Sequence, residues 1–168
     1  AVPILINGGI VGFPTETYYG LGADIENPET IDRLFKLKKR EYNKPILVLI
    51  NDIEQLNGLV REIPENYYLL MDKFWPGPLT LIFPASDKVS SLLTGNSGTI
   101  GVRVSSNPIT RELCKQWGKP LTATSANISG FEPAKTKEDV IDQFENKLDY
   151  VISNNCEQTG LGSTIVGE

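Results

Sequence analysis

The chain alternates short runs of apolar residues with longer stretches in which apolar and polar residues mix at helical spacing. Apolar runs of about four to eight residues are typical of buried strands, and apolar residues three or four apart are typical of one helix face. The apolar runs predict strands over 10–13, 46–50, 79–83, 99–104, 121–124, 150–153 and 164–166. Strands interspersed with helices in this way favour an α/β (α+β) fold.

Capping signals predict where the helices begin and end. Asn27 before Pro28 is a typical helix start, and Asn107 before Pro108 repeats it. Gly118 is a typical residue just after a helix end. The predicted helices run over 28–40, from 52, over 64–75, over 108–117 and from 136.

The composition indicates a soluble globular protein. A length of 168 residues suits one well-packed domain, so 1–168 is expected to be a single domain. No apolar run is long enough to cross a bilayer, and no charged segment followed by an apolar one opens the chain. Cys114 and Cys156 lack CxxC spacing, which predicts neither a disulfide nor a zinc site. We therefore expect a cytoplasmic protein with no membrane partner, and Cys114 buried in a helix.

Histidine is absent from the sequence. The chain therefore cannot build a Ser-His-Asp or Cys-His site, and it lacks the commonest general base near neutral pH. Cations, hydroxyl groups and positioning remain, and these suffice for transfer at phosphorus. The net charge of −5 argues against nonspecific binding of nucleic acid.

Two stretches gather small polar residues where a predicted strand ends. "FPTETYYGLG", residues 13–22, carries two hydroxyl groups and a carboxylate at 15–17. "LTATSANISG", residues 121–130, crowds hydroxyl groups and an amide into 125–129. Such a turn can hydrogen-bond to itself or bind a ligand, and the residues alone leave both readings open.

The segment "KLKKREYNKP", residues 36–45, is strongly basic. Cations at the C-terminal end of a helix complement its dipole, which is the simplest explanation. However, Lys38, Arg40 and Lys44 precede a predicted buried strand that would anchor them. A basic cluster anchored in this way is also suited to bind a triphosphate.

Arg103 lies within the apolar run "TIGVRV". A charge in such a run must be paired or must reach a cleft, because its desolvation is otherwise uncompensated. One possibility is an internal salt bridge with one of the 21 acidic residues. The other is a clamp for the carboxylate of a substrate.

Taken together, six segments resemble the YrdC-like (TsaC) family of threonylcarbamoyl-AMP synthases. They occur in the family's order and cover nearly the whole chain: "FPTETYYGLGAD", the triplet 38–40, "FWPGPLT", "GTIGVRV", "TSANISG" and "STIV". The resemblance implies a single-domain twisted mixed sheet flanked by helices, of the YrdC/RibB type, with a large concave and positively lined cleft.

The resemblance also implies the reaction. L-threonine, bicarbonate or CO₂, and ATP would form threonylcarbamoyl-AMP and pyrophosphate, with Mg²⁺ accompanying ATP largely through phosphate oxygens and water. Partner proteins that modify tRNA would then accept the adenylate, so that contact of this chain with tRNA would be weak at most.

Carried over position by position, the resemblance implies two sets of site residues. The catalytic cations are Lys38 and Arg40. The ATP-binding set is Lys38, Arg40, Lys44, Thr99, Ser125 and Asn127. The threonine-binding set is Thr17, Arg103, Ala123 and Ser163, with Arg103 facing the threonine carboxylate.

This sequence departs from the family pattern at three places. Leu49 stands where many members have His, and Lys44 stands where many have Asn. The sequence also ends just after "STIV", before a segment whose arginine often covers ATP. Two other functions remain as alternatives: a non-enzymatic RNA-binding module with the same basic cleft, and a related enzyme that forms carbamoyl-adenylate from carbamoyl phosphate.

Overall fold

The structure is a computed structural model that describes residues 1–145, 147–154 and 162–167. In these ranges the strands form two mixed sheets, with strand orders β7-β2-β1-β8 and β6-β3-β5-β4-β9. The strands are β1 (Val11–Pro14), β2 (Tyr19–Gly22), β3 (Val48–Leu49), β4 (Leu79–Pro84), β5 (Thr99–Arg103), β6 (Leu121–Thr122), β7 (Thr124–Ser125), β8 (Tyr150–Val151) and β9 (Thr164–Val166). The predicted mixed α/β fold is confirmed, with its strands divided between two sheets.

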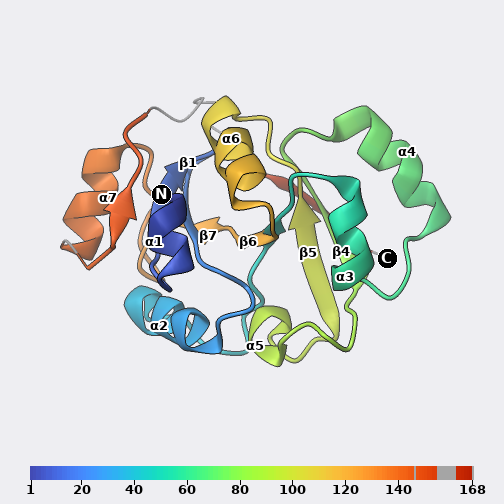
Figure 1. Ribbon diagram of the computed structural model, residues 1–168, viewed down its shortest axis with the longest axis horizontal. Helices are drawn as coiled ribbons and strands as arrows, with labels where there is room; N and C mark the ends of the chain where they lie inside the picture. The colour runs from blue at the N-terminus through green and yellow to red at the C-terminus, as the bar shows by residue number, and fades with distance from the viewer. Residues whose placement is uncertain (146, 155–161, 168) are drawn as a thin grey trace.

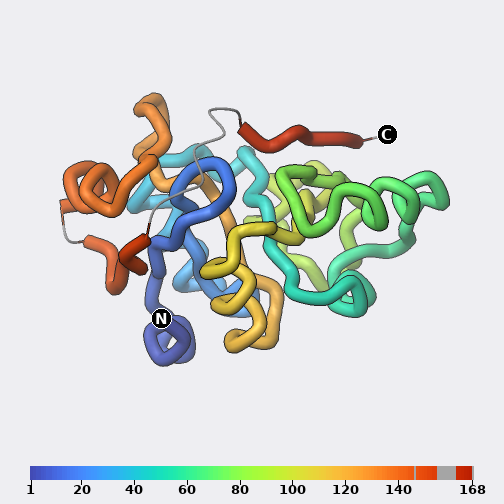
Figure 2. Tube along the Cα trace, turned by 90° about the horizontal axis from the view of Figure 1, so that it is seen from above, coloured from blue at the N-terminus to red at the C-terminus, as the bar shows by residue number. Residues whose placement is uncertain are grey.

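The helices pack around these sheets. They are α1 (Val2–Ile6), α2 (Pro28–Lys38), the 3₁₀ helix η1 (Ile53–Gln55), α3 (Leu56–Leu59), α4 (Glu65–Phe74), α5 (Ser91–Thr94), α6 (Pro108–Trp117) and α7 (Lys137–Phe144). Helices α7 and α4 lie at opposite ends of the molecule, and α6 lies between them (Figure 1). Strand β9 lies on the opposite side from α1 (Figure 2). None of the described helices combines the length and the apolar character needed to cross a membrane.

Residues 121–125 link the two sheets. Strand β6 pairs antiparallel with β3 in one sheet, and β7 pairs antiparallel with β2 in the other. Between them, the amide of Ala123 donates to the carbonyl of Leu47 over 2.8 Å. The predicted single strand is therefore two short strands, because the chain changes its pairing partner at Ala123. The polar turn that follows is held at the junction of the two sheets.

The predicted helix caps are present. Asn27 accepts from the amide of Thr30 over 3.0 Å, and Asn107 accepts from two amides at the start of α6. Helix α7 begins with a capping box formed by Thr136 and Asp139. Side-chain oxygens in these positions satisfy amides that have no partner inside the helix.

Strand β2 was not predicted, because two of the four residues in its sequence "YGLG" are glycine, which is depleted in strands. Its two glycines pack beneath the ring of Phe13 on the neighbouring strand. A Cβ atom added at Gly20 would lie 3.0 Å from the Phe13 ring, and one at Gly22 would lie 2.8 Å from it. The strand therefore needs glycine where a large ring crosses it.

Apolar side chains form the core between the sheets and helices. In one cluster, the ring of Tyr67 on α4 contacts Phe83 on β4 edge to face, with 5.2 Å between the centroids. Cys114 is buried in α6, as predicted, and burial raises the pKa of its thiol to about 12. Cys156 lies outside the described residues. Leu49 is fully buried in the cluster that also contains Leu113.

Candidate active site

A cavity of about 300 Å³ lies where the two sheets meet. Its walls come from the turn between β1 and β2, the C-terminal end of β5, the crossing at 123–125 and the residues just before β9. Five residues predicted from the sequence line it: Thr17, Arg103, Ala123, Ser125 and Ser163. The structure thus brings the whole predicted threonine-binding set together with one residue of the predicted ATP-binding set.

Arg103 is buried at this cavity and paired with an acid. Its Nε lies 3.6 Å from Oε1 of Glu16, and the two side chains are 6% and 3% exposed. The hydroxyl of Ser105 donates to the other carboxylate oxygen of Glu16 over 2.5 Å. Burial lowers the pKa of Arg103, and the negative charge of Glu16 opposes that shift. The sequence left open a salt bridge or a carboxylate clamp, and this geometry allows Arg103 to serve as both.

The threonine-rich turn bonds to itself and also faces the cavity. The hydroxyl of Thr15 donates to the carbonyl of Tyr18 over 2.6 Å and accepts from the amide of Thr17 over 3.2 Å. The two threonine hydroxyl groups are 3.1 Å apart. Thr15 therefore shapes the turn, and it positions the hydroxyl of Thr17 at the cavity wall.

The turn after β7 is also internally bonded. The hydroxyl of Ser125 donates to the side-chain oxygen of Asn127 over 2.6 Å. The Asn127 amide group donates to the carbonyls of Ile128 and Phe131, over 3.1 and 2.9 Å. Ser125 is exposed, so its oxygen can reach a ligand in the cavity without loss of the turn.

Lys38 lies beneath this turn. Its side chain leaves the last residue of α2, and its ammonium group donates to the carbonyl of Ser125 and, over 2.7 Å, to that of Asn127. The residue is only 1% exposed. Burial lowers the pKa of Lys38 to about 7, and the positive charge of Arg40 adds to the shift.

Arg40 and Lys44 lie in the loop that follows α2. Arg40 donates to the carbonyl of Pro45 over 2.8 Å, is partly buried, and has a pKa lowered by that burial. Lys44 is exposed and pairs with Glu41 over 3.3 Å. A backbone carbonyl of the loop therefore fixes the Arg40 side chain, whereas the Lys44 side chain lies at the surface.

Thr99 begins β5, at the opposite end of that strand from Arg103. Its hydroxyl lies 2.8 Å from that of Ser97. The loop before it packs tightly on the basic segment, since a Cβ atom at Gly95 would lie 2.5 Å from the carbonyl oxygen of Asn43. Thr99 is thus absent from the cavity lining, and it follows the loop that packs on the basic segment.

The predicted site residues, all of which the structure describes, fall into two groups: those that line the cavity and those that do not. The cavity lining lacks five predicted residues: Lys38, Arg40, Lys44, Thr99 and Asn127. Lys38 and Asn127 are both hydrogen-bonded to Ser125, which does line the cavity. The roles given to these residues toward ATP stay predictions.

Glu16 is the buried partner of Arg103, and the sequence did not reveal this pairing. Its partner Arg103 signalled that a buried acid was needed, but the chain offers 21 acidic residues. The pairing depends on the ends of β1 and β5 meeting in space, and spacing along the chain does not reveal this. Leu47 and Pro133 also line the cavity, and nothing in the sequence indicated that they would.

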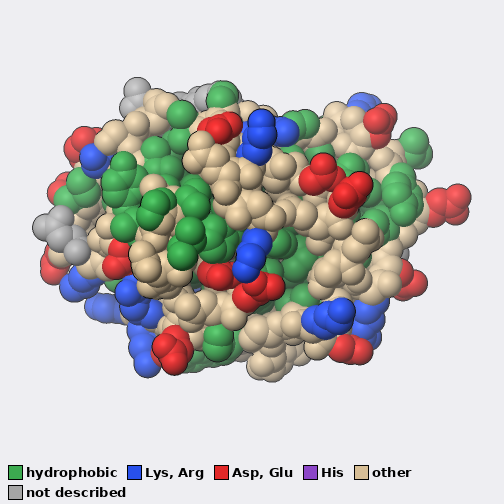
Figure 3. Space-filling view, viewed as in Figure 1, with side chains coloured by type: hydrophobic (Ala, Val, Ile, Leu, Met, Phe, Trp, Pro, Cys, Tyr) green, Lys and Arg blue, Asp and Glu red, His purple; other side chains and the backbone are tan. Residues whose placement is uncertain are grey.

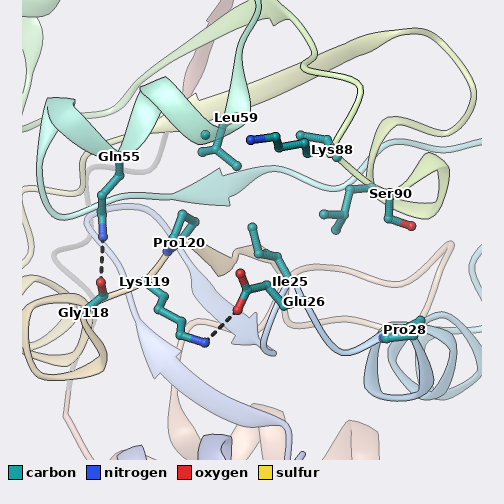
Figure 4. Close-up of a pocket in the computed structure, with 13 residues that line it drawn as sticks. Ile25, Glu26, Pro28, Gln55, Leu59, Lys88, Ser90, Gly118, Lys119 and Pro120 are labelled. Atoms are coloured by element: carbon teal, nitrogen blue, oxygen red, sulfur yellow. Dashed lines mark hydrogen bonds and ion pairs between the residues drawn. The ribbon is translucent and has the colours of Figure 1, made fainter.

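A larger cavity, of about 760 Å³, lies between α2, α3, α5 and the loop after α6. Lys119 there pairs with Glu26 over 2.6 Å, and Gln55 donates to the carbonyl of Gly118 over 3.1 Å (Figure 4). None of the predicted site residues lines it. On the face of the molecule drawn in Figure 3, the Lys and Arg side chains are interspersed with Asp and Glu.

The structure offers no ready metal site among the residues it describes. These residues contain no group of three or more Cys, Asp or Glu side chains placed to hold an ion.

Comparison with known proteins identifies the family. The family model of Sua5, YciO and YrdC proteins, described as "Telomere recombination", matches residues 3–167. The threonylcarbamoyl-AMP synthase of Pyrococcus abyssi is 37% identical over 166 residues, which are 99% of this chain and 49% of that protein. The threonylcarbamoyl-AMP synthase of Vibrio parahaemolyticus is 40% identical over 146 residues, which are 86% of this chain and 79% of that protein.

A solved structure of the same family has the same fold as this chain. The crystal structure of P. abyssi Sua5 complexed with L-threonine superposes with a TM-score of 0.95 at 36% identity, covering 99% of this chain and 49% of that one. The chain therefore belongs to the Sua5/YciO/YrdC family, as its motifs predict. It spans about half the length of the Pyrococcus relative.

Proposed function

We propose that this domain catalyses the formation of threonylcarbamoyl-AMP and pyrophosphate from L-threonine, CO₂ or bicarbonate, and ATP. One observation carries the proposal: Thr17, Arg103, Ala123 and Ser163, which lie far apart in sequence, line one cavity together with Ser125. The names of the relatives, and the L-threonine complex of P. abyssi Sua5, support the same activity.

The cavity suits a small amino acid. Arg103 offers a planar, doubly donating guanidinium, which matches a carboxylate. Thr17 and Ser163 bring hydroxyl groups that can hydrogen-bond the polar groups of threonine, and Ala123 leaves room beside them. A volume of about 300 Å³ is at the small end of ligand sites, as expected for an amino acid and a one-carbon unit.

The triphosphate would extend from Ser125 toward the basic segment. Lys38 reaches the backbone of Ser125, and Arg40 and Lys44 follow it in the chain. Neighbouring positive charges stabilise the charge that develops on pyrophosphate as it leaves. In this arrangement Thr99 contacts the nucleotide from the start of β5, beside the loop that carries Lys44.

The chemistry needs no protein nucleophile. The amine of threonine attacks CO₂ and loses a proton, which gives a carbamate. A carbamate oxygen then attacks the α-phosphorus of MgATP, the bond from that phosphorus to the bridging oxygen of the β-phosphate breaks, and magnesium pyrophosphate leaves. The protein supplies orientation and charge stabilisation, which agrees with a chain that has no histidine.

The product is a reactive mixed anhydride. We propose that it is passed to proteins that attach the threonylcarbamoyl group to an adenosine of tRNA, so that this domain itself contacts tRNA weakly or not at all. The net charge of −5 supports this division of labour.

Pyrophosphate release from MgATP tests the proposal. We expect release only when L-threonine and bicarbonate are both present. Release that is indifferent to threonine but requires carbamoyl phosphate would favour the carbamoyl-adenylate enzyme. Salt-dependent tRNA binding without any pyrophosphate release would favour the RNA-binding module.

A further inference from the structure

The ammonium group of Lys38 is already engaged by the protein itself. It donates to the carbonyl oxygens of Ser125 and Asn127, and the amide of Ser129 returns a bond to the carbonyl of Lys38 over 2.8 Å. Three hydrogen bonds thus join the C-terminal end of α2 to the turn at 125–129. The two segments are separated by more than eighty residues of sequence.

Lys38 differs from Arg40 and Lys44, the other two predicted ATP-binding cations of the basic segment, in being almost completely buried. Lys38 is 1% exposed, whereas the Lys44 side chain is 51% exposed and Arg40 is partly buried. A cation that neutralises a phosphate needs donors free to face it. Lys38 spends at least two of its three donors on backbone carbonyls, and it is absent from the cavity lining.

The carbonyls that Lys38 binds explain why a cation is needed there. Ser125 ends β7, and its carbonyl also accepts from the amide of Asn127 over 3.0 Å. The carbonyl of Asn127 has the Lys38 ammonium as its donor among the described residues, because the side chains of the turn bond other groups. A carbonyl that is removed from water and has no donor destabilises the folded chain. A flexible lysine chain can reach two such oxygens at once, which a shorter side chain from α2 could not do.

We infer that Lys38 is a positioning residue: it holds the Ser125–Asn127 turn in the shape that forms the cavity wall, and it does not contact the substrate phosphates. This inference rests on the proposed function for its kinetic consequence, and on the hydrogen bonds alone for its structural one. Because Ser125 lines the threonine cavity, displacement of the turn affects both substrates.

Hydrogen exchange in the ligand-free protein tests the structural consequence. In Lys38→Met, which keeps the chain length but removes the donors, we expect the amides of Ala126 and Ser129 to exchange at least tenfold faster. Amides of the β4–β5 pair serve as an internal reference for overall stability. Lys36→Met is the matched control, since Lys36 lies on the same helix with a side chain 71% exposed.

Nuclear magnetic resonance of the wild-type chain gives a test that needs no variant. With ¹⁵N-labelled lysine and ¹³C-labelled carbonyls, the Lys38 Nζ signal should show couplings to the carbonyls of Ser125 and Asn127. These couplings should persist when MgATP is added. Their disappearance on addition of MgATP, with a new contact to phosphorus, would overturn the inference.

Steady-state kinetics complete the test. In Lys38→Met we expect the KM values for ATP and for L-threonine to rise together, by about tenfold each. A rise confined to ATP, with exchange at the turn unchanged, would show a direct phosphate contact instead. If the wild-type chain releases no pyrophosphate, the proposed function fails, while the exchange and coupling experiments still decide the role of Lys38.

Discussion

The Nε atom of Arg103 lies 3.6 Å from Oε1 of Glu16, and both side chains are almost completely buried. The pair joins the end of β5 to the turn that follows β1, so it holds together two walls of the cavity. An arginine held by a buried acid has a defined orientation, which a substrate carboxylate needs for bidentate binding. The bound carboxylate would be the second negative group around one guanidinium.

Removal of the Glu16 charge is therefore expected to impair threonine binding selectively. In Glu16→Gln we expect the KM for L-threonine to rise roughly tenfold, equivalent to about 1.4 kcal/mol, because Arg103 loses the group that orients it. The KM for ATP should change less than about twofold, which is about 0.4 kcal/mol. Initial rates of pyrophosphate release at varied threonine and varied ATP measure both values.

Glu26→Gln is the matched control for this variant. Glu26 is an exposed acid that pairs with Lys119 at the larger cavity. This control should leave both KM values unchanged. An equal rise for ATP and threonine in Glu16→Gln would contradict a selective role of the pair.

Arg40 is expected to matter for ATP far more than for folding. It is partly exposed and bonds the carbonyl of Pro45, so Arg40→Ala should lower Tm by only a few degrees, as for a loss of about 1 kcal/mol. The Kd for ATP should rise at least tenfold, about 1.4 kcal/mol. Calorimetric titration and thermal unfolding measure the two effects.

Lys39→Asn controls for the loss of one positive charge near Arg40. Lys39 has a left-handed backbone with φ of 50°, which Asn tolerates better than most residues. We expect little change in ATP affinity in this control. A loss of Tm in Arg40→Ala as severe as its loss of ATP affinity would mean that Arg40 only caps and stabilises the end of α2.

The pH dependence of stability should reveal Lys38. Burial lowers its pKa to about 7 in the folded chain, against about 10.4 in an unfolded one. Between these values the unfolded chain binds more protons, so this group makes the free energy of unfolding rise with pH. As the pH falls through 7, this contribution is lost.

Urea unfolding at pH 7, 8 and 9 measures this effect. Other groups titrate in the same range, so the quantity of interest is the difference between wild type and Lys38→Met. As the pH rises, the free energy of unfolding of the wild type should increase relative to that of Lys38→Met. A difference independent of pH would show that Lys38 keeps an ordinary pKa in the folded chain.

The capping box of α7 should contribute to the stability of the fold and not to catalysis or substrate binding. Thr136 accepts from the amide of Asp139 over 3.1 Å, and Thr136→Ala should lower the free energy of unfolding by about 1 kcal/mol. Thr136 is not part of the cavity lining, so kcat and both KM values should stay unchanged in folded protein. A changed KM would mean that α7 positions the turn through Gln143, which bonds residues of the loop before it.

Local signals predicted much of the fold. Asn27 and Asn107 marked helix starts correctly, because caps act within three residues of chain. The run 46–50 was predicted as a strand, but only Val48–Leu49 pairs in a ladder. Its ends bond elsewhere, with the amide of Ile46 donating to Leu93. Such pairings depend on the position of distant segments.

The site was predicted only in part, for the same reason. The resemblance to the family predicted four threonine-binding residues, and these four share one cavity. It did not show that Lys38 is buried, because a lysine in a basic segment is usually exposed to solvent. Neither did it reveal Glu16, whose role exists only when two strand ends meet.

The identity of the reaction product tests the central claim most directly. The protein is incubated with MgATP, L-threonine and ¹³C-bicarbonate, and the products are analysed by mass spectrometry. We expect a single new species that contains AMP, threonine and the labelled carbon, formed together with pyrophosphate. A labelled adenylate that forms without threonine, or pyrophosphate without any labelled adenylate, would contradict the account.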